Sequence, residues 1–420
     1  MSTRTSRPTR RAVLADPTYR SLFGAQVVAL LGTGLLTVAL SLLAFQVAPG
    51  RAGVVVATAL SLKMVAYVLV APVASAAVAR LSPRTVLLGA NAARAVVALG
   101  LPWVDQVWQI YVLIVVLQSA SATFTPAFQA VVPTVLPDED DYTRALSLSR
   151  LAYDLESVVS PVAAAALLVV LSYHGLFVAT SLGFFLSAVL VLRAGHLGEA
   201  AGVDRAFGRR VTRGVALFVG DRLLRALLAL YLVVATATAL VLVDTVVVVR
   251  QDLGLGETAV AWTLGAFGAG SMLVALCVPA ALRRVDERTL MLGGAALTAA
   301  ATVLTGVVLA GAHPWSAVLG LWFALGAGVS AVLTPTGRIV NRQVRTSERP
   351  AAFAAAFSLS HAFFLLTYPL AGWVGHRWGV ATAALVLGAL GTAAAVLAVL
   401  GWRRTTPADR ALIGSRSAGG

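Results

Sequence analysis

Charged side chains are scarce in this 420-residue sequence. Aspartate, glutamate, lysine and arginine make up 12% of it, whereas about 25% is usual for soluble domains. Hydrophobic residues make up 59%, above the roughly 45–50% of soluble domains. The composition therefore excludes an ordinary soluble protein and indicates an integral protein of the lipid bilayer.

The sequence also has few of the residues from which metal sites and catalytic sites are built. Cys277 is the only cysteine, which excludes an intramolecular disulfide and a cysteine-based metal site. The five histidines are scattered, and we find neither a glycine-rich phosphate-binding loop nor a nucleophile motif. We expect no metal, no cofactor and no enzymatic activity.

Acidic residues are fewer than basic ones, 18 against 32, which gives a net charge of +14. In a soluble chain such an excess would suggest a nucleic-acid partner. Basic residues of membrane proteins collect in cytoplasmic loops, however, and no basic run here is interleaved with aromatic residues. We therefore expect no nucleic-acid partner.

Long apolar runs are abundant. A helix needs about 20 apolar residues to cross the hydrocarbon layer of a bilayer, and twelve runs reach that length. They are 21–48, 53–79, 85–104, 107–127, 145–171, 175–193, 223–249, 258–282, 289–311, 314–334, 352–375 and 379–402. With the N-terminus in the cytoplasm, nearly all arginines fall in cytoplasmic segments, so we predict that both termini are cytoplasmic.

The longest polar stretch divides these runs into two groups of six. The sequence thus predicts an all-α integral membrane protein with twelve transmembrane helices in two six-helix bundles. We expect a monomer that passes many times through the cell (inner or plasma) membrane. Its predicted parts are a cytoplasmic N-terminal tail (1–20), the first bundle (21–193), a cytoplasmic linker (194–222), the second bundle (223–402) and a cytoplasmic C-terminal tail (403–420).

A short repeat relates the two halves. RLSPRTVLLG follows the second apolar run and RVDERTLMLG follows the eighth. Arg80, Arg84, Thr85 and Gly89 recur at one constant spacing as Arg284, Arg288, Thr289 and Gly293. Many secondary transporters are built from parallel six-helix repeats, with the substrate site at the interface of the repeats. The repeat therefore predicts a site between the two bundles.

These features resemble the major facilitator superfamily (MFS) over nearly the whole chain. The motif G-x-x-x-D-R-x-G-R-R of that family, in the loop after the second helix, is matched in part, with Ala79 in place of the acid. The aligned positions are Ser75, Ala79, Arg80, Ser82 and Arg84, of which the two arginines keep the residue of the motif and the two serines replace glycines. The resemblance implies a gate in this loop and its second copy, with Arg80, Arg84, Arg284 and Arg288 as gating candidates.

Two further stretches are similar to exporters within that family. FTPAFQAVVPTVLP resembles the enterobactin-exporter and macrolide-efflux branch of drug:proton antiporters. ESVVSPVAAA is similar to the antiporter motif G-x-x-x-G-P-x-x-G-G, with Pro161 at the proline and with Ser160, Ala164 and Ala165 in place of glycines. This resemblance implies export rather than import.

Four consecutive acids, Asp138 to Asp141, follow the proline-rich stretch. Prolines end a helix, and acids at the start of the next helix are stabilised by its positive end. One interpretation is therefore a helix stop and a cap. The alternative is a gate in which these acids face cytoplasmic arginines.

Charges near the bilayer centre are costly and usually paired. The predicted helices contain five: Lys63, Arg94, Asp154, Glu156 and Asp244. Their sum is one negative charge, which one proton would neutralise. We expect Asp154 to face the cavity or pair with Arg94, Glu156 to lie in the antiporter-like packing seam, and Lys63 to be paired. Asp244 is either solvated at the outer end of its helix or functional.

Four uncharged polar residues complete the candidate site. His361 is either a packed neutral histidine or a proton carrier or substrate contact. Gln26, Tyr67 and Gln118 are candidate cavity residues. We predict a secondary active transporter that exports small amphipathic compounds (drug, macrolide or siderophore-like) in exchange for protons. The alternatives are an exporter of a metal ion or metal chelate, and a non-transporting membrane sensor or scaffold.

Overall fold

The computed structural model describes residues 13–48, 52–199, 207–311 and 314–402. All regular structure in these residues is helical. Most of the predicted N-terminal tail, part of the linker and the C-terminal tail lie outside the described residues. The remaining predictions can be compared with the structure element by element.

The first bundle contains six long helices. They are α1 (Pro17–Val47), α2 (Ala52–Ala77), α3 (Pro83–Gly100), α4 (Val107–Val135), α5 (Glu139–Leu168) and α6 (Tyr173–Arg193). Helix α6 packs against α1 and α3, and α4 packs against α2 and α3. Short 3₁₀ turns at Val13–Ala15 and Leu101–Trp103 precede α1 and follow α3.

The second bundle begins after a linker helix, α7 (Phe207–Gly220). The first long helix of this bundle is α8 (Arg222–Ala239). It continues through a π-helical segment (Leu240–Asp244), α9 (Thr245–Val247) and a second π-helical segment (Val248–Asp252). The remaining elements are α10 (Glu257–Ala281), α11 (Glu287–Ala310), α12 (Trp315–Leu333), the short α13 (Thr336–Gln343), a 3₁₀ turn (Thr346–Glu348), α14 (Arg349–Trp378) and α15 (Val380–Gly401).

The predicted fold class is confirmed: the protein has twelve membrane helices in two bundles of six. Among the described residues, eleven helices are long and apolar enough to cross a bilayer, and α5 completes the twelve. The sequence analysis did not predict α7, α13 or the π-helical segments. These elements are short or depart from the regular helix period, so a 20-residue apolar criterion does not detect them.

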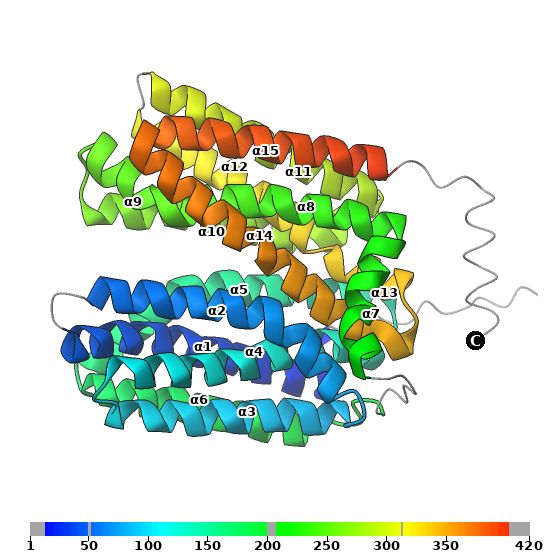
Figure 1. The fold of residues 1–420 in the computed structure, drawn as a ribbon. Helices are drawn as coiled ribbons and strands as arrows, with labels where there is room; N and C mark the ends of the chain where they lie inside the picture. Colours follow the sequence, from blue (N-terminus) through cyan, green and yellow to red (C-terminus); the bar gives the residue numbers. More distant parts are fainter. Residues whose placement is uncertain (1–12, 49–51, 200–206, 312–313, 403–420) are drawn as a thin grey trace, which may run out of the picture.

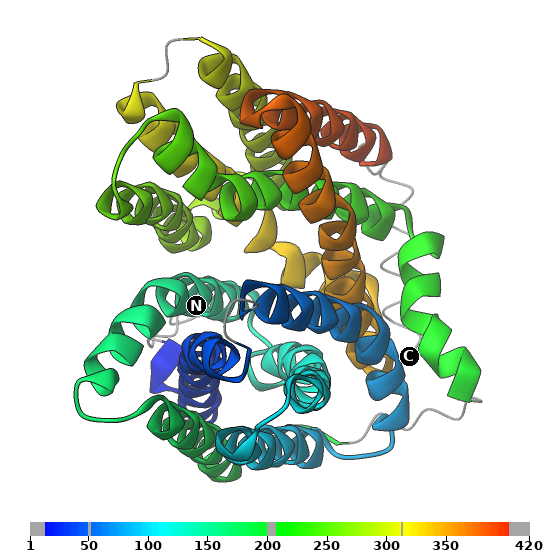
Figure 2. The ribbon, with the colours of Figure 1, turned by 60° about the vertical axis from the view of Figure 1, so that its left-hand side comes forward.

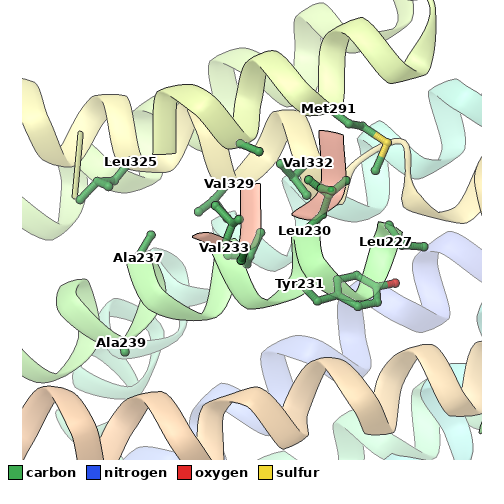
Figure 3. Packing of buried hydrophobic residues seen from close by; sticks show 14 of the residues in the cluster. Leu227, Leu230, Tyr231, Val233, Ala237, Ala239, Met291, Leu325, Val329 and Val332 are labelled. Carbon is green, nitrogen blue, oxygen red and sulfur yellow. The ribbon is translucent and has the colours of Figure 1, made fainter. Parts of the chain in front are cut away.

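Side-chain size sets how closely the helices pack. In the second bundle, Leu230, Val233 and Ala237 of α8 lie at three- and four-residue spacing and pack beside Val329 and Val332 of α12 (Figure 3). In lipid, burial from water contributes little to helix association, so close packing has to stabilise it. Small residues allow the helix backbones to approach closely enough for such packing.

Two glycines illustrate this close approach. A Cβ on Gly270 of α10 would meet the carbonyl of Phe323, and a Cβ on Gly326 of α12 would meet the carbonyl of Phe267. The backbones of α10 and α12 therefore touch where they cross.

The two bundles meet through α2 against α14 and α5 against α10. They converge at the end that carries α7 and α13 and diverge toward the opposite end (Figures 1 and 2). We call the first the arginine-rich end, defined by residues 78–84, 194–199, 207–222, 282–288 and 334–349, and the second the far end.

Candidate functional site

A cavity of about 540 Å³ lies between the two bundles. Helices α1, α2, α4 and α5 of the first bundle and α8, α12 and α14 of the second supply most of its wall. The wall is rich in aromatic rings, namely Tyr67, Phe124, Tyr153, Tyr231, Phe267, Phe353, Phe357 and Phe364. A concave, mostly apolar wall with a few polar groups is typical of small-molecule sites.

Lys63 and Glu156 bring opposite charges to the wall of this cavity. Both side chains line it, Lys63 from α2 and Glu156 from α5, and their charges attract each other. The Lys63 Nζ atom also lies 5.6 Å from the centre of the Tyr67 ring, one helical turn further along α2. Lys63 is thus surrounded by an opposite charge and an aromatic face, both of which stabilise a cation.

His361 is packed into the aromatic wall. Its Nδ1 lies 2.7 Å from the Phe357 carbonyl oxygen, and because a carbonyl only accepts, Nδ1 carries the hydrogen. The ring lies edge-on to Tyr67, with centres 4.9 Å apart, and near Phe357 and Phe364. His361 therefore lines the cavity as part of a ring cluster.

The candidate amides hold neighbouring hydroxyl groups. The Tyr67 hydroxyl donates to Gln118 Oε1 at 3.0 Å, and the Ser149 hydroxyl donates to Gln26 Oε1 at 3.0 Å. Gln26 lines the cavity, whereas Gln118 is buried behind Tyr67. Gln118 therefore positions a cavity residue from behind.

Arg94 of α3 is largely buried in the first bundle and also lines the central cavity. Its guanidinium group donates to Asn91 Oδ1 and lies over two rings, 4.3 Å from the centre of Phe124 and 4.6 Å from that of Phe184. Asn91 in turn donates to Ser187 at 3.0 Å. The charge is stabilised by ring faces and amide oxygen, which are cation partners that the sequence analysis did not consider.

Asp154 is placed differently from its prediction. It accepts from Arg150 Nη2 at 2.9 Å and from the Ser271 hydroxyl at 2.6 Å, and Ser271 lies on α10 of the other bundle. The expectation that Asp154 faces the cavity or pairs with Arg94 is therefore wrong. Residues two apart point to different sides of a helix, and on α5 it is Glu156 that faces the cavity.

The antiporter-like stretch packs against Gly34 of α1. A Cβ at Gly34 would collide with the Ser160 side chain and lie 2.7 Å from Glu156 Oε1. Ser160 and Ala164, one turn apart, are buried, while Ala165 is exposed. The side chain of Pro161 lies outside the described residues. The stretch thus provides a seam between α1 and α5, with Glu156 at the edge of the cavity.

Asp244 lies in the first π-helical segment and is buried, so the solvated alternative is wrong. Its Oδ2 atom has no hydrogen-bond partner in the described part of the chain. Gly375 of α14 packs over it, where a Cβ would come within 3.1 Å of Oδ1. Asp244 is not among the residues that line the central cavity.

The gating candidates form bonds within their own bundles. Arg84 donates to the carbonyls of Ala194 and Gly195 at the end of α6, and Arg288 Nε donates to the Trp402 carbonyl at the end of α15, at 2.8 Å. A cation is favoured at the negative end of a helix. Arg80 and Arg284 are exposed in the turns after α2 and α10.

The acidic run contacts the second bundle instead. Asp138 caps α5, because its side chain accepts from the Asp141 amide at 3.0 Å. Glu139 pairs with Arg338 Nη2 at 3.0 Å and with Arg342, and Asp140 lies 3.9 Å from Arg283. The run therefore both caps a helix and joins the bundles.

The partners of Glu139 were missed in the sequence analysis. Arg338 and Arg342 also pair with Glu287 of α11, each at 2.9 Å, so both arginines lie between an acid of each bundle. Arg338 in addition donates to Thr143. The four-residue spacing in RIVNR places both arginines on one helical face, which is a signal that the sequence contained.

Comparisons with known proteins agree with this architecture. The family model described as Major Facilitator Superfamily matches residues 22–247 and 227–419. The "Uncharacterized MFS-type transporter YfiS" of Bacillus subtilis (strain 168) is 25% identical over 388 residues, 88% of this chain and 89% of that protein.

Solved structures are similar in fold. The human organic anion transporter MFSD10 (TETRAN) has a TM-score of 0.75 at 14% identity, covering 91% of this chain and 99% of its own. A bacterial homologue of the iron transporter ferroportin in an outward-facing state has a TM-score of 0.74 at 14% identity, covering 92% and 100%. The E. coli fucose:proton symporter FucP has a TM-score of 0.72 at 13% identity, covering 94% and 100%.

Proposed function

This chain belongs to the major facilitator superfamily, and from that premise we propose that it is a proton-coupled exporter of small amphipathic compounds. It would work by alternating access, in which the two bundles rock about a site between them. The observation that carries this proposal is the central cavity, whose aromatic wall contains Lys63 and Glu156. Rings suit the apolar part of a substrate, and the two opposite charges suit its polar part.

Glu156 is the residue that we propose for coupling. A carboxylate near the bilayer centre costs about 2.5–3.5 kcal/mol on insertion scales, so its retention points to a function. Glu156 is reached from the cavity, whereas Asp154, two residues before it on α5, is engaged with α10. A proton and a cationic substrate group would compete for the Glu156 carboxylate, and such competition is what exchange requires.

We further propose that the arginine-rich end is cytoplasmic, with both termini on that side of the cell membrane. The concentration of arginines there supports this orientation, because basic residues are retained on the cytoplasmic side. The conformation described above would then be outward-facing, since the bundles meet at the arginine-rich end. Release of the Glu139 ion pairs would accompany the change to an inward-facing state.

Organic substrates fit the cavity better than metal ions. In the described residues there is no group of three or more His, Cys, Asp or Glu side chains that could hold a metal ion. The predicted class of drug, macrolide or siderophore-like compounds therefore stays the leading one. A mostly apolar cavity with a charged pair also favours transport over a scaffold role.

The test is uptake of ethidium, an aromatic cation, by liposomes with an acidic lumen that contain the purified protein. Protein inserted with its arginine-rich end outward should accumulate the dye only while the pH gradient persists. Glu156→Gln should reduce uptake to the rate without a gradient. Asp105→Asn, which neutralises an exposed acid outside the cavity, is the matched control and should behave as wild type. Gradient-driven uptake that persists in Glu156→Gln would contradict the proposed coupling.

A further inference from the structure

A second cavity, of about 440 Å³, lies at the arginine-rich end. Its wall comes from α2, the turn into α3, α4, the segment after α6, and the start of α14. It shares no lining residue with the central cavity. It is therefore a separate site, which the proposed transport function does not use.

One side of this second cavity is apolar and made of small residues. From α4 these are Ala122, Pro126, Ala127, Ala130 and Val131. Together they leave a long smooth surface, because none carries a charge or a bulky side chain. Two threonines of α4, Thr123 and Thr134, also line the cavity, but the wall carries no charge and accepts a hydrocarbon chain.

Position 79, in the turn after α2, extends this apolar wall. Ala79 lines the second cavity and stands where the loop motif quoted above has an acid. An aspartate there would place a carboxylate against the wall, and its desolvation would be costly without a partner. Alanine at this position keeps the wall uncharged.

The opposite end of the second cavity is cationic. Arg349, at the start of α14, lines it together with Thr346 and Ser347. The Arg349 Nε atom is buried and has no hydrogen-bond partner in the described part of the chain. The neighbouring acid, Glu348, pairs with Arg213 at 2.8 Å.

One acid, Glu199, lines the second cavity, but it does not act as the counter-charge of Arg349. Glu199 is exposed to solvent, whereas the Arg349 Nε is buried. The Nε atom itself is closed off from the cavity, because a buried atom offers no surface to a ligand. Arg349 nevertheless lines the cavity, and its positive charge favours an anion there beside the apolar surface.

We infer that the second cavity binds a single-chain anionic amphiphile, with the anionic group at Arg349 and the hydrocarbon chain along α4. The start of α14 belongs to the second bundle, and the other walls belong to the first. The ligand therefore contacts both bundles only while they meet at the arginine-rich end. Binding shifts the population toward that conformation, since a ligand favours the state that it binds better.

The experiment is photolabelling of the full chain in lipid nanodiscs with an alkyl sulfonate that carries a diazirine on its chain. A sulfonate keeps its charge at any accessible pH, so protonation does not complicate the result. Mass spectrometry should locate the label between residues 122 and 131. Decanesulfonate should compete for the label, and decanol, its uncharged counterpart, should not.

Two substitutions test the two ends of the site. Arg349→Gln should weaken labelling about tenfold or more, because it removes a charge-assisted hydrogen bond. Arg345→Gln, an exposed arginine outside the cavity wall, is the matched control and should label as wild type. Ala79→Asp should also reduce labelling, since it places a negative charge in the apolar wall.

Three results would overturn the inference: equal competition by decanol, label found only in the central cavity, or unchanged labelling of Arg349→Gln. The competition result uses wild-type protein and therefore holds even if a variant folds poorly. No transport measurement enters this test. Its outcome is thus independent of whether the protein exports ethidium.

Discussion

Glu139→Gln is expected to weaken the contact between the bundles at the arginine-rich end without unfolding either bundle. The Glu139 carboxylate reaches across to Arg338 at 3.0 Å and to Arg342. The other acid beside these arginines, Glu287, belongs to their own bundle. Glutamine keeps the size of the side chain and removes its charge, which affects the bundle contact and also the start of α5, where an acid is favoured.

The magnitude follows from exposure. The Glu139 side chain is 47% exposed, so water and salt screen both ion pairs. Exposed pairs contribute about 0.2–1 kcal/mol each, and two pairs near the upper end of that range contribute about 1–2 kcal/mol. A difference of that size changes the ratio of the two conformations by about 5- to 30-fold.

The assay is a distance measurement between spin labels on the two bundles. Cys277→Ser removes the native cysteine, and Arg80→Cys with Arg284→Cys places labels on two exposed residues at the arginine-rich end. Glu139→Gln should increase the population with the longer distance by the factor given above, and high salt should do the same in part. Asp141→Asn is the control, because Asp141 pairs with Arg144 of the same helix at 3.0 Å. Equal populations in the two variants would refute the assignment of Glu139 as a link between the bundles.

The remaining predictions concern packing. Gly34→Ala should destabilise the protein by about 1–3 kcal/mol in thermal unfolding, because the added methyl group meets Ser160 and Glu156. Gly89→Ala, where a Cβ meets no atom within 4 Å, is the control, and equal loss in both would contradict the seam between α1 and α5. Asp244→Asn should keep or raise the melting temperature at neutral pH, because it replaces a buried carboxylate whose Oδ2 has no partner, a cost of about 1–3 kcal/mol. A clear drop in melting temperature would mean that the charge of Asp244 is stabilised in the folded protein.

The sequence predicted the two-bundle fold because length and polarity alone determine which segments cross a bilayer. Helices α7 and α13 did not meet that criterion. In FGRRVTRGVALFVG, arginines and apolar residues alternate at helical spacing, and the buried Phe218 shows that one face packs on the bundles. An analysis of helical periodicity within the polar segments would have detected α7.

The site was predicted less well, because contacts between distant residues decide it. Asp154 and Glu156 were expected on different sides of α5, but the partner that decides which side each takes, Ser271, lies on α10. Arg94 was expected to require an acid. The rings of Phe124 and Phe184 take that place, and aromatic residues are too frequent in membrane helices to mark a cation site from sequence.

The acidic run and the altered loop motif have a common explanation in the structure. Arg84 and Arg288 are used at the ends of α6 and α15, inside their own bundles. The charges that face each other across the bundles include Glu139 with the arginines of α13, and Asp140 with Arg283. An acid at position 79 is therefore not needed to link the bundles at this end, and Ala79 instead forms part of an apolar cavity wall. Because the start of α5 makes the contact between the bundles, position 79 can lack the acid of the motif and form part of the second cavity instead.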